Sequence, residues 1–262
     1  MRALHTAATG MMAQELNVQV ISNNIANMRT TGYKRQRAEF QDLLYEQVTR
    51  VGTQTSAQGN ILPAGIEMGS GVKTVGTPRL MSQGELTQTN KDYDLAIRGE
   101  GFFKILLPDG RTAYTRDGSF ELDAQGRLVT AQGNLVQPGI TIPQNAMSVS
   151  VNSQGQVFVT IPGNNTPSQV GQIELSIFVN KAGLQSIGDN LYLETPASGA
   201  PQNGNPTTDG FGNLQQGYLE QANVEAVSEI SDLIAAQRAY EMNAKVITAA
   251  DQMLSTTSNL MR

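Results

Sequence analysis

Apolar residues near the amino terminus recur at intervals of seven. The first set is Leu4, Met11, Val18 and Ile25, and a second set, three residues after members of the first, is Ala7, Ile21 and Met28. This spacing places both sets on one stripe of an α-helix, as in a coiled coil. Neither glycine nor proline occurs from Met11 to Thr31, and asparagines precede Gly32, so the helix is predicted to end near Met28–Thr31.

A longer stripe of the same period runs to the carboxyl terminus. Its members are Leu219, Ala226, Leu233, Tyr240, Ile247, Leu254 and Met261, with Ile230 and Ala244 expected at flanking seam positions. No glycine or proline interrupts Tyr218 to Arg262, so the pattern predicts a helix of about 35–40 residues, roughly 55–60 Å long. An ordinary long helix in a bundle remains the alternative, but a strict period of seven favours a helix that supercoils with partners.

The middle of the chain has the pattern of β-strands. Between about Val72 and Leu193, short apolar runs alternate with glycine and aspartate turns, as in the run from Phe102 through Asp109-Gly110 to Thr115. The stretch from Leu122 to Val129 also resembles the stretch from Val151 to Val159. We interpret this likeness as one hairpin turn used twice.

Two polar segments flank the β region and are expected to lack regular structure. Val51 to Gly71 and Thr195 to Asn213 are rich in Gly, Pro, Ser, Thr, Gln and Asn. The fold class predicted is α+β: antiparallel, coiled-coil-like terminal helices bracket an all-β central domain with extended connectors. The predicted segments are 1–35 (helical), 36–74 (connector, with an excursion at 45–63), 75–193 (β-rich), 194–218 (connector) and 219–262 (helical).

Composition removes several classes of function. The chain has 262 residues, a net charge of −5, no cysteine and one histidine, His5. Thiolate chemistry is impossible, a site with several histidine ligands is impossible, and no overall positive field attracts nucleic acid. His5 is expected to be an ordinary surface residue. We therefore expect no metal, no cofactor and no catalytic residue.

The remaining candidates for chemistry are weak. Asp92 and Asp94 form a carboxylate pair that could serve an enzyme, but no further cluster is nearby in sequence, so a solvated strand edge is the favoured interpretation. Gly99-Glu100-Gly101 lacks the third glycine of a dinucleotide loop.

A basic cluster surrounds Gly32-Tyr33, but acidic residues follow at once and cancel its field. The cluster consists of Arg29, Lys34, Arg35 and Arg37. The first thirty residues contain no continuous apolar run of a secretory signal, and no run is long enough for a membrane helix.

Two stretches at opposite ends of the chain resemble the signatures of bacterial flagellar axial proteins, the rod and hook subunits. The first covers Ile21 to Tyr45, and its motif residues are Asn23, Asn24, Asn27, Gly32 and Lys34. The second covers Gly217–Glu220 and Gln237–Lys245, with Gln237, Arg238 and Tyr240 as motif residues. Between them, Gly99–Phe103, Tyr114–Phe120 and Gly133 are similar to the β domain of the family.

The resemblance implies a structural, self-assembling subunit that transmits torque and is not an enzyme. Length, Arg35-Gln36-Arg37 and the segment Tyr45 to Pro63 are most similar to distal rod subunits, in which that excursion is associated with a stiff rod. The expected interface residues are Leu4, Met11, Val18, Ile25, Leu219, Leu233, Tyr240, Ile247 and Leu254. Expected partners are further copies, neighbouring proximal rod and hook-family proteins, and the surrounding basal-body rings, without nucleic acid or membrane insertion.

The family also implies a periplasm-spanning location in the basal body and type III export without a cleaved signal peptide. Three alternatives stay open. A proximal rod or hook subunit would share the same termini. A wall-cleaving hydrolase carried by the rod would need a carboxylate pair in a cleft, and a coiled-coil binding module would form a closed oligomer.

Overall fold

A computed structural model describes residues 2–50 and 64–260 and divides the chain into two compact units. The first, which we call the helical unit, comprises Met1–Ile25, Gln36–Pro78 and Glu225–Arg262. The second, the β unit, comprises Ala26–Arg35 and Arg79–Val224. The helix–strand–helix order confirms the predicted α+β class.

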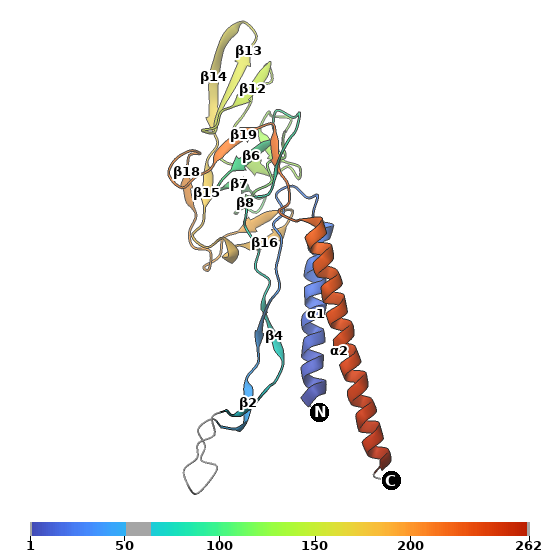
Figure 1. Cartoon of the computed structure of the whole chain (residues 1–262). Helices are drawn as coiled ribbons and strands as arrows, with labels where there is room; N and C mark the ends of the chain where they lie inside the picture. Colours follow the sequence, from blue (N-terminus) through green and yellow to red (C-terminus); the bar gives the residue numbers. More distant parts are fainter. Residues whose placement is uncertain (1, 51–63, 261–262) are drawn as a thin grey trace. The chain divides into compact units, whose positions relative to one another are not determined.

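Two antiparallel helices dominate the helical unit (Figure 1). Helix α1 spans Arg2–Ala26 and helix α2 spans Ala226–Leu260, which is 35 residues as expected. As residue numbers rise along α1 from Gly10 to Asn24, those of the contacted residues on α2 fall from Asn243 to Glu229. The two helices therefore run antiparallel.

Helix α1 ends earlier, and helix α2 begins later, than the sequence predicts. Residues 27–35 of the expected helical segment 1–35 are turns and loop. Leu219, expected on the helical stripe, lies in strand β20 (Tyr218–Glu220), which pairs with β5 (Leu86–Gln88). Leu219 satisfied the period of seven, but its backbone hydrogen bonds with a strand distant in sequence override that local pattern.

The segment between α1 and the β unit forms two antiparallel ribbons. Their strands are β1 (Glu39–Asp42) with β4 (Val72–Gly76), and β2 (Tyr45–Thr49) with β3 (Ile66–Gly69). The expectation that Val51 to Gly71 lacks regular structure is thus wrong for β3, and 51–63 lies outside the described residues. Strand β3 could not be predicted from its polar composition. Almost every residue of the β2–β3 ribbon is exposed, so no buried face requires apolar and polar residues to alternate.

The β unit is built from antiparallel strands. The largest sheet contains β7 (Phe102–Leu106), β8 (Thr112–Thr115), β9 (Phe120–Leu122), β10 (Leu128–Thr130), β11 (Leu135–Val136), β15 (Leu175–Ile177), β16 (Gln185–Gly188), β17 (Leu191–Leu193) and β18 (Gln202–Gly204). A second sheet contains β12 (Ser148–Val151), β13 (Gln156–Ile161) and β14 (Asn164–Gln172), and β6 (Leu95–Arg98) pairs with β19 (Asn213–Gln216). A 3-10 turn, η1, spans Lys181–Gly183. Strand β18 is a further exception to the expected irregular segment Thr195 to Asn213.

The repeated hairpin turn predicted from sequence is confirmed. Strands β9 and β10 pair Leu122 with Leu128, and β12 and β13 pair Val151 with Val157. In the first turn the Asp123 carboxylate accepts bonds from two backbone amides, and in the second the Asn152 amide oxygen does the same. Both turns end on a glycine with positive φ, which a side chain would strain.

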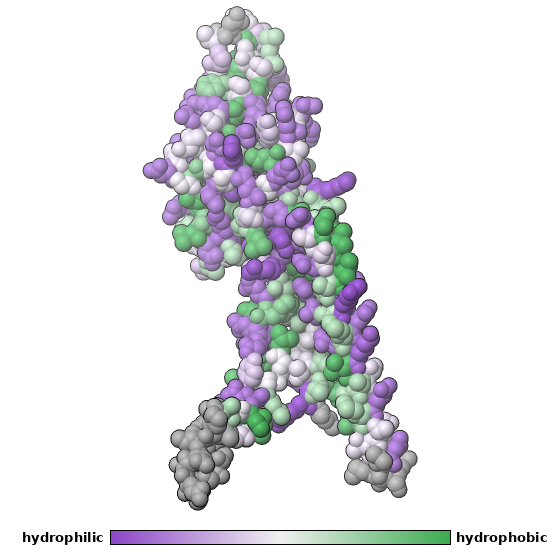
Figure 2. Space-filling model, viewed as in Figure 1, coloured by the Kyte–Doolittle hydropathy of each residue, from purple (hydrophilic) through white to green (hydrophobic). Residues whose placement is uncertain are grey.

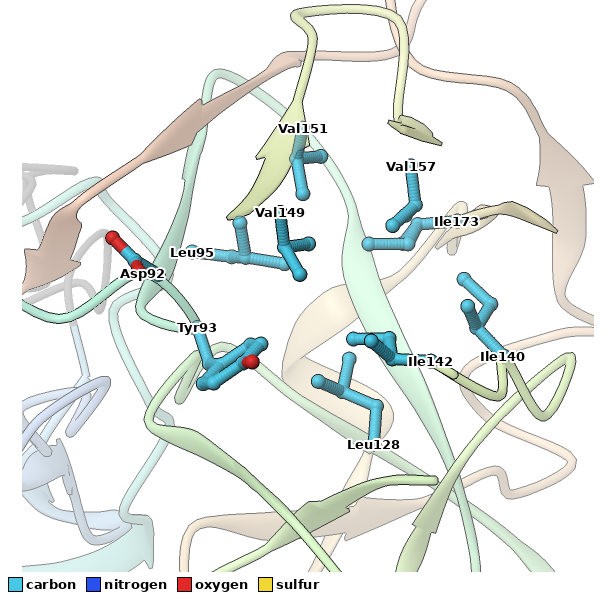
Figure 3. A pocket seen from close by; sticks show the side chains of 10 residues that line it. All are labelled: Asp92, Tyr93, Leu95, Leu128, Ile140, Ile142, Val149, Val151, Val157 and Ile173. Atoms are coloured by element: carbon cyan, nitrogen blue, oxygen red, sulfur yellow. The ribbon is translucent and has the colours of Figure 1, made fainter. Parts of the chain in front are cut away.

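A hydrophobic core joins the main sheet to the β12–β14 and β6–β19 sheets, with Phe103, Ile105 and Leu175 fully buried. It contains a cavity of about 10 Å³. Figure 3 shows valines of β12 and β13 on one side of this cavity, facing Leu128, Ile140 and Ile142. An apolar space of this size holds no ligand, since even one water needs roughly 10–15 Å³ and polar partners. The cavity is a packing gap in the core.

Tyr114 is expected to make the protein less stable as pH rises above 10. It is 3% exposed and packs edge-on against Phe178, and burial, with the charge of Glu194, raises the pKa of Tyr114 to about 12. The unfolded chain releases this proton near the ordinary tyrosine pKa of 10.0, so this contribution to stability is complete below pH 10 and declines toward pH 12.

Replacing Tyr114 by phenylalanine should therefore remove about 2–3 kcal/mol of the alkaline loss in unfolding free energy. Urea unfolding followed by circular dichroism on either side of this pH window measures the difference. Tyr45→Phe, at a 55% exposed position, is the matched control. An alkaline loss that is the same in Tyr114→Phe and wild type would contradict this role.

Candidate assembly interface

The two terminal helices meet along a seam of small and polar residues. On α2 the buried members are Glu229, Ala236 and Ala250, with Leu233, Asn243 and Ile247 half-buried between them. The seam therefore has the predicted period of seven, but Ile230, expected to flank it, is 49% exposed. The residues that flank the seam lie one position before the predicted Ile230 and Ala244, at Glu229 and Asn243. Sequence analysis missed them because neither side chain is apolar.

Close approach of the helices depends on Gly10 and Asn24. A Cβ atom added to Gly10 would lie 2.8 Å from Nδ2 of Asn243, so glycine gives the asparagine its space. The Asn24 amide nitrogen donates to the Glu229 carboxylate at 3.1 Å and to the Gln36 carbonyl at 2.9 Å. Its oxygen accepts from the Gln36 amide at 2.9 Å. Asn24 thus links α1 by hydrogen bonds both to α2 and to Gln36 in the segment that follows α1.

The other predicted residues of α1 lie at the margins of this seam. Leu4, Met11, Val18 and Ile25 are all half-buried, whereas Ala7, Ala13, Val20 and Ile21 are buried. A second face of α1 contacts the ribbons: Thr9 Oγ1 accepts from the Val72 amide at 3.4 Å, and Arg2 pairs with Glu46 at 2.7 Å. The predicted stripe therefore remains partly open to other molecules.

Several large apolar side chains of α2 are exposed in the isolated chain. They are Val227, Ile230, Ile234, Tyr240, Met242, Val246, Met253 and Leu254. Figure 2 shows hydrophobic residues distributed along α2 among hydrophilic ones. The motif residues Gln237 and Arg238 are exposed as well, and residues 251–259 are exposed throughout. Burial of such residues stabilises an association by about 25 cal/mol for each Å² of apolar surface.

The other motif residues serve the fold. Asn23 is exposed at the end of α1, and Asn27 begins the turn after it, where its backbone oxygen accepts from the Thr30 amide at 3.0 Å. Lys34 lies in the β unit and is 0% exposed. Its ammonium donates to the Ser82 carbonyl at 2.8 Å and forms a short ion pair with Glu220.

Glu220 is the centre of a buried charge cluster, which we define as Lys34, Arg116 and Glu220. Its Oε2 accepts from Arg116 at 3.3 Å, and its Oε1, the oxygen that pairs with Lys34, also accepts from the Gly84 backbone amide at 2.9 Å. Arg116 also donates to the Gly99 carbonyl at 2.8 Å and covers the Phe102 ring at 5.3 Å. The cluster joins the two family signatures, one near each end of the chain, to the central strands.

Burial lowers the pKa of the Lys34 ammonium, and the attraction of Glu220 opposes that effect. A lysine with a lowered pKa binds its proton less tightly in the folded state than in the unfolded state, so this contribution makes the protein more stable as pH rises toward the ordinary lysine pKa of 10.5. Sequence analysis placed Lys34 in a basic surface cluster. Its burial corrects that interpretation, and Arg37 is likewise paired, with Glu39 at 2.6 Å.

Gly32 should be intolerant of any side chain. Its φ is +67°, and an added Cβ would lie 2.6 Å from the Asp117 amide nitrogen. We expect Gly32→Ala to lower the free energy of unfolding by well over the ~1–2 kcal/mol of a left-handed backbone alone. The control is Gly110→Ala, at φ +84° with no atom within 4 Å, which should show only that backbone cost. Equal urea midpoints for the two variants would refute the close approach.

The carboxylate pair considered for chemistry is divided between two environments. Asp94 is buried, 2% exposed, and accepts from the Thr89 hydroxyl at 2.6 Å, so it is not part of a solvated strand edge as expected. Asp92 is exposed. Among the residues that the structure describes, no group of three metal-ligating side chains is found. His5 is exposed on α1.

Within 2–50 and 64–260, no helix has the length and apolar character needed to cross a bilayer.

The chain combines two terminal helices that carry exposed apolar residues with a β unit between them in sequence. Comparison with known families finds matches for each of these parts. Residues 4–34 match the family described as "Flagella basal body rod protein", residues 96–159 match "Flagellar hook protein FlgE/F/G D1 domain", and residues 215–260 match "Flagellar basal body rod FlgEFG protein C-terminal".

Relatives match over nearly their whole length. The flagellar basal-body rod protein FlgG of Caulobacter vibrioides is 58% identical, over 99% of each chain. FlgG of Agrobacterium fabrum is 49% identical over 100% of each chain, and the rod protein FlgF of Caulobacter vibrioides is 36% identical over 99% of this chain and 95% of its own. The chain belongs to the flagellar basal-body rod protein family.

Proposed function

We propose that this chain is the structural subunit of the flagellar distal rod, the drive shaft that transmits torque from motor to hook. The observation that carries the proposal is the 58% identity with a FlgG protein over essentially the whole chain, against 36% with FlgF of the same bacterium. This difference favours the distal subunit over a sibling rod or hook protein. The family matches at both helical ends support a place among the rod and hook proteins, which the siblings share.

The subunits would assemble through their terminal helices. Seam residues of α1 and α2 are only partly buried within one chain, so neighbouring copies, or neighbouring rod and hook-family proteins, would complete their burial. The β2–β3 ribbon supports this, because Tyr45, Val48 and Ile66 are each more than half exposed. Isolated two-stranded ribbons are marginal in water, so this part of the excursion 45–63 would dock on adjacent subunits and stiffen the rod.

The protein would act without catalysis, cofactor or metal, since Asp92 and Asp94 lie in different environments. Export through the flagellar type III apparatus, without a cleaved signal peptide, and a place across the periplasm inside the basal-body rings complete the proposal. The separation of Asp92 from Asp94 therefore favours the structural role over the rival hydrolase, which needs a carboxylate pair in one cleft.

Complementation tests the function directly. We expect the chain to restore swimming to a Caulobacter vibrioides strain that lacks its own FlgG, and purified basal bodies should then contain a complete rod. The matched control is a strain lacking FlgF, in which the chain should not restore swimming. Rescue of the FlgF strain alone would favour the sibling assignment, and rescue of neither would contradict the proposal.

A further inference from the structure

A groove between α1 and α2 in the helical unit has an acidic lining. Its volume is about 600 Å³. The residues that line it are Glu15, Val18, Gln19, Gln237, Tyr240 and Glu241. Val18 is half-buried and the Tyr240 ring is 43% exposed, so the groove offers an apolar wall and an aromatic face beside two carboxylates.

The two carboxylates of the groove lack a cation. Among the described residues, neither Glu15 nor Glu241 forms an ion pair within 4.0 Å. Arg238 and Lys245 are three and four positions from Glu241 on the same helix, yet neither pairs with it in the described part of the chain. Arg238 and Lys245, the cations of the carboxy-terminal signature, therefore do not neutralise the carboxylates of the groove.

The basic residues belong to the side of α2 away from the seam. With 3.6 residues per turn, Arg238 and Lys245 fall on the same side as Val227 and Ile234, opposite to Glu229 and Ile247. Val227 is 74% exposed and Ile234 is 47% exposed. This outer face thus carries apolar side chains and two cations, with Glu241 at its margin toward the groove. The groove is apolar and acidic, so Arg238 and Lys245 of the outer face are complementary to it in charge.

We propose that the outer face of α2 in one copy docks into the α1–α2 groove of a second copy. The Arg238 guanidinium lies between Glu15 and Glu241 of the neighbour and stacks on its Tyr240 ring, as a planar cation does on an aromatic face. The proposal rests on the proposed function, because it names the contact by which the subunits assemble. Because the two surfaces differ, the contact is heterologous, and in a rod its rotation does not close, so that it propagates into an open helical array.

Engineered cysteines test this contact without background, since the natural chain has none. The full-length double variant Glu15→Cys/Arg238→Cys, concentrated to assemble and then oxidised, should give a ladder of disulfide-linked multimers on a non-reducing gel. Each single variant should give no ladder. In the matched control Glu15→Cys/Asp232→Cys, the second cysteine is also exposed but lies on another side of α2, so no ladder is expected.

Charge reversal gives a second measurement. Arg238→Glu should raise the protein concentration needed for assembly by about tenfold or more, as expected for the loss of a charge-assisted contact repeated at every subunit. In the double variant Glu15→Arg/Arg238→Glu, the protein concentration needed for assembly should fall again, at least in part, toward that of the unmodified chain. Circular dichroism equal to that of the unmodified chain establishes that the variants fold.

The outcomes separate the two proposals. Assembly of the unmodified chain together with a ladder and a charge rescue supports the groove contact. If the double-cysteine chain forms fibres by electron microscopy but no ladder, the groove contact is overturned and the proposed function stands. Failure of the unmodified chain both to assemble and to complement a FlgG-deficient strain overturns the proposed function and the groove contact with it.

Discussion

Leu233→Asp should abolish assembly while leaving the β unit folded. Leu233 lies on the seam of α2, between the buried residues Glu229 and Ala236. Burial of a leucine contributes roughly 1.5–3 kcal/mol, and an aspartate here adds a second carboxylate one turn from Glu229 without a new partner. Every subunit of a polymer repeats this contact, so the loss recurs at each addition step.

The neighbouring residue provides the control for Leu233. Asp232 is exposed, so Asp232→Lys should assemble nearly as the unmodified chain does. Sedimentation of assembled protein measures both variants, and circular dichroism checks that the β unit retains its strands. Sedimentation of Leu233→Asp at the wild-type concentration would show that the seam does not govern assembly.

Glu220→Gln should lower the free energy of unfolding of the β unit by about 3–5 kcal/mol. The substitution keeps the size and an acceptor oxygen but removes the buried carboxylate that pairs with both Lys34 and Arg116. Glu100, near Arg116, is half exposed. Two cations then remain buried without a buried counter-charge, which costs more than the pair itself gained on folding. The urea midpoint of the full-length chain, followed by circular dichroism, measures this loss.

Glu121→Gln is the matched surface control for the buried cluster. Glu121 pairs with Lys91 at 3.7 Å, and both side chains are about two-thirds exposed. Its loss should cost no more than ~0–1 kcal/mol, as for other exposed ion pairs. If Glu220→Gln unfolded at the same urea concentration as Glu121→Gln, the charge cluster would have no special role in joining the signatures.

Local patterns predicted the parts of the fold that depend on local chemistry. The hairpin turns at Asp123 and Asn152 were readable because an aspartate or asparagine and a glycine at fixed spacing determine them. The period of seven in α2 was also readable over 35 residues. Leu219 shows the limit, because a strand partner distant in sequence ended the helical pattern there.

The candidate interface was only partly predictable for the same reason. A search for apolar residues finds Leu233 and Ile247 in the seam. It misses Gly10, which allows the helices to approach closely, and it misses Asn24 and Glu229, which form a hydrogen bond between the helices. The pairing of Lys34 with Glu220 joins positions far apart in sequence, and no local signal in either segment indicates the other. Only the folded chain brings these charges together.

Electron microscopy of the concentrated full-length protein tests the central claim, that the terminal helices make this chain a rod subunit. A contact between unlike surfaces whose rotation does not close builds an open filament, so we predict straight tubes or fibres, absent in Leu233→Asp. Discrete small rings, or identical fibres from Leu233→Asp, would contradict the account.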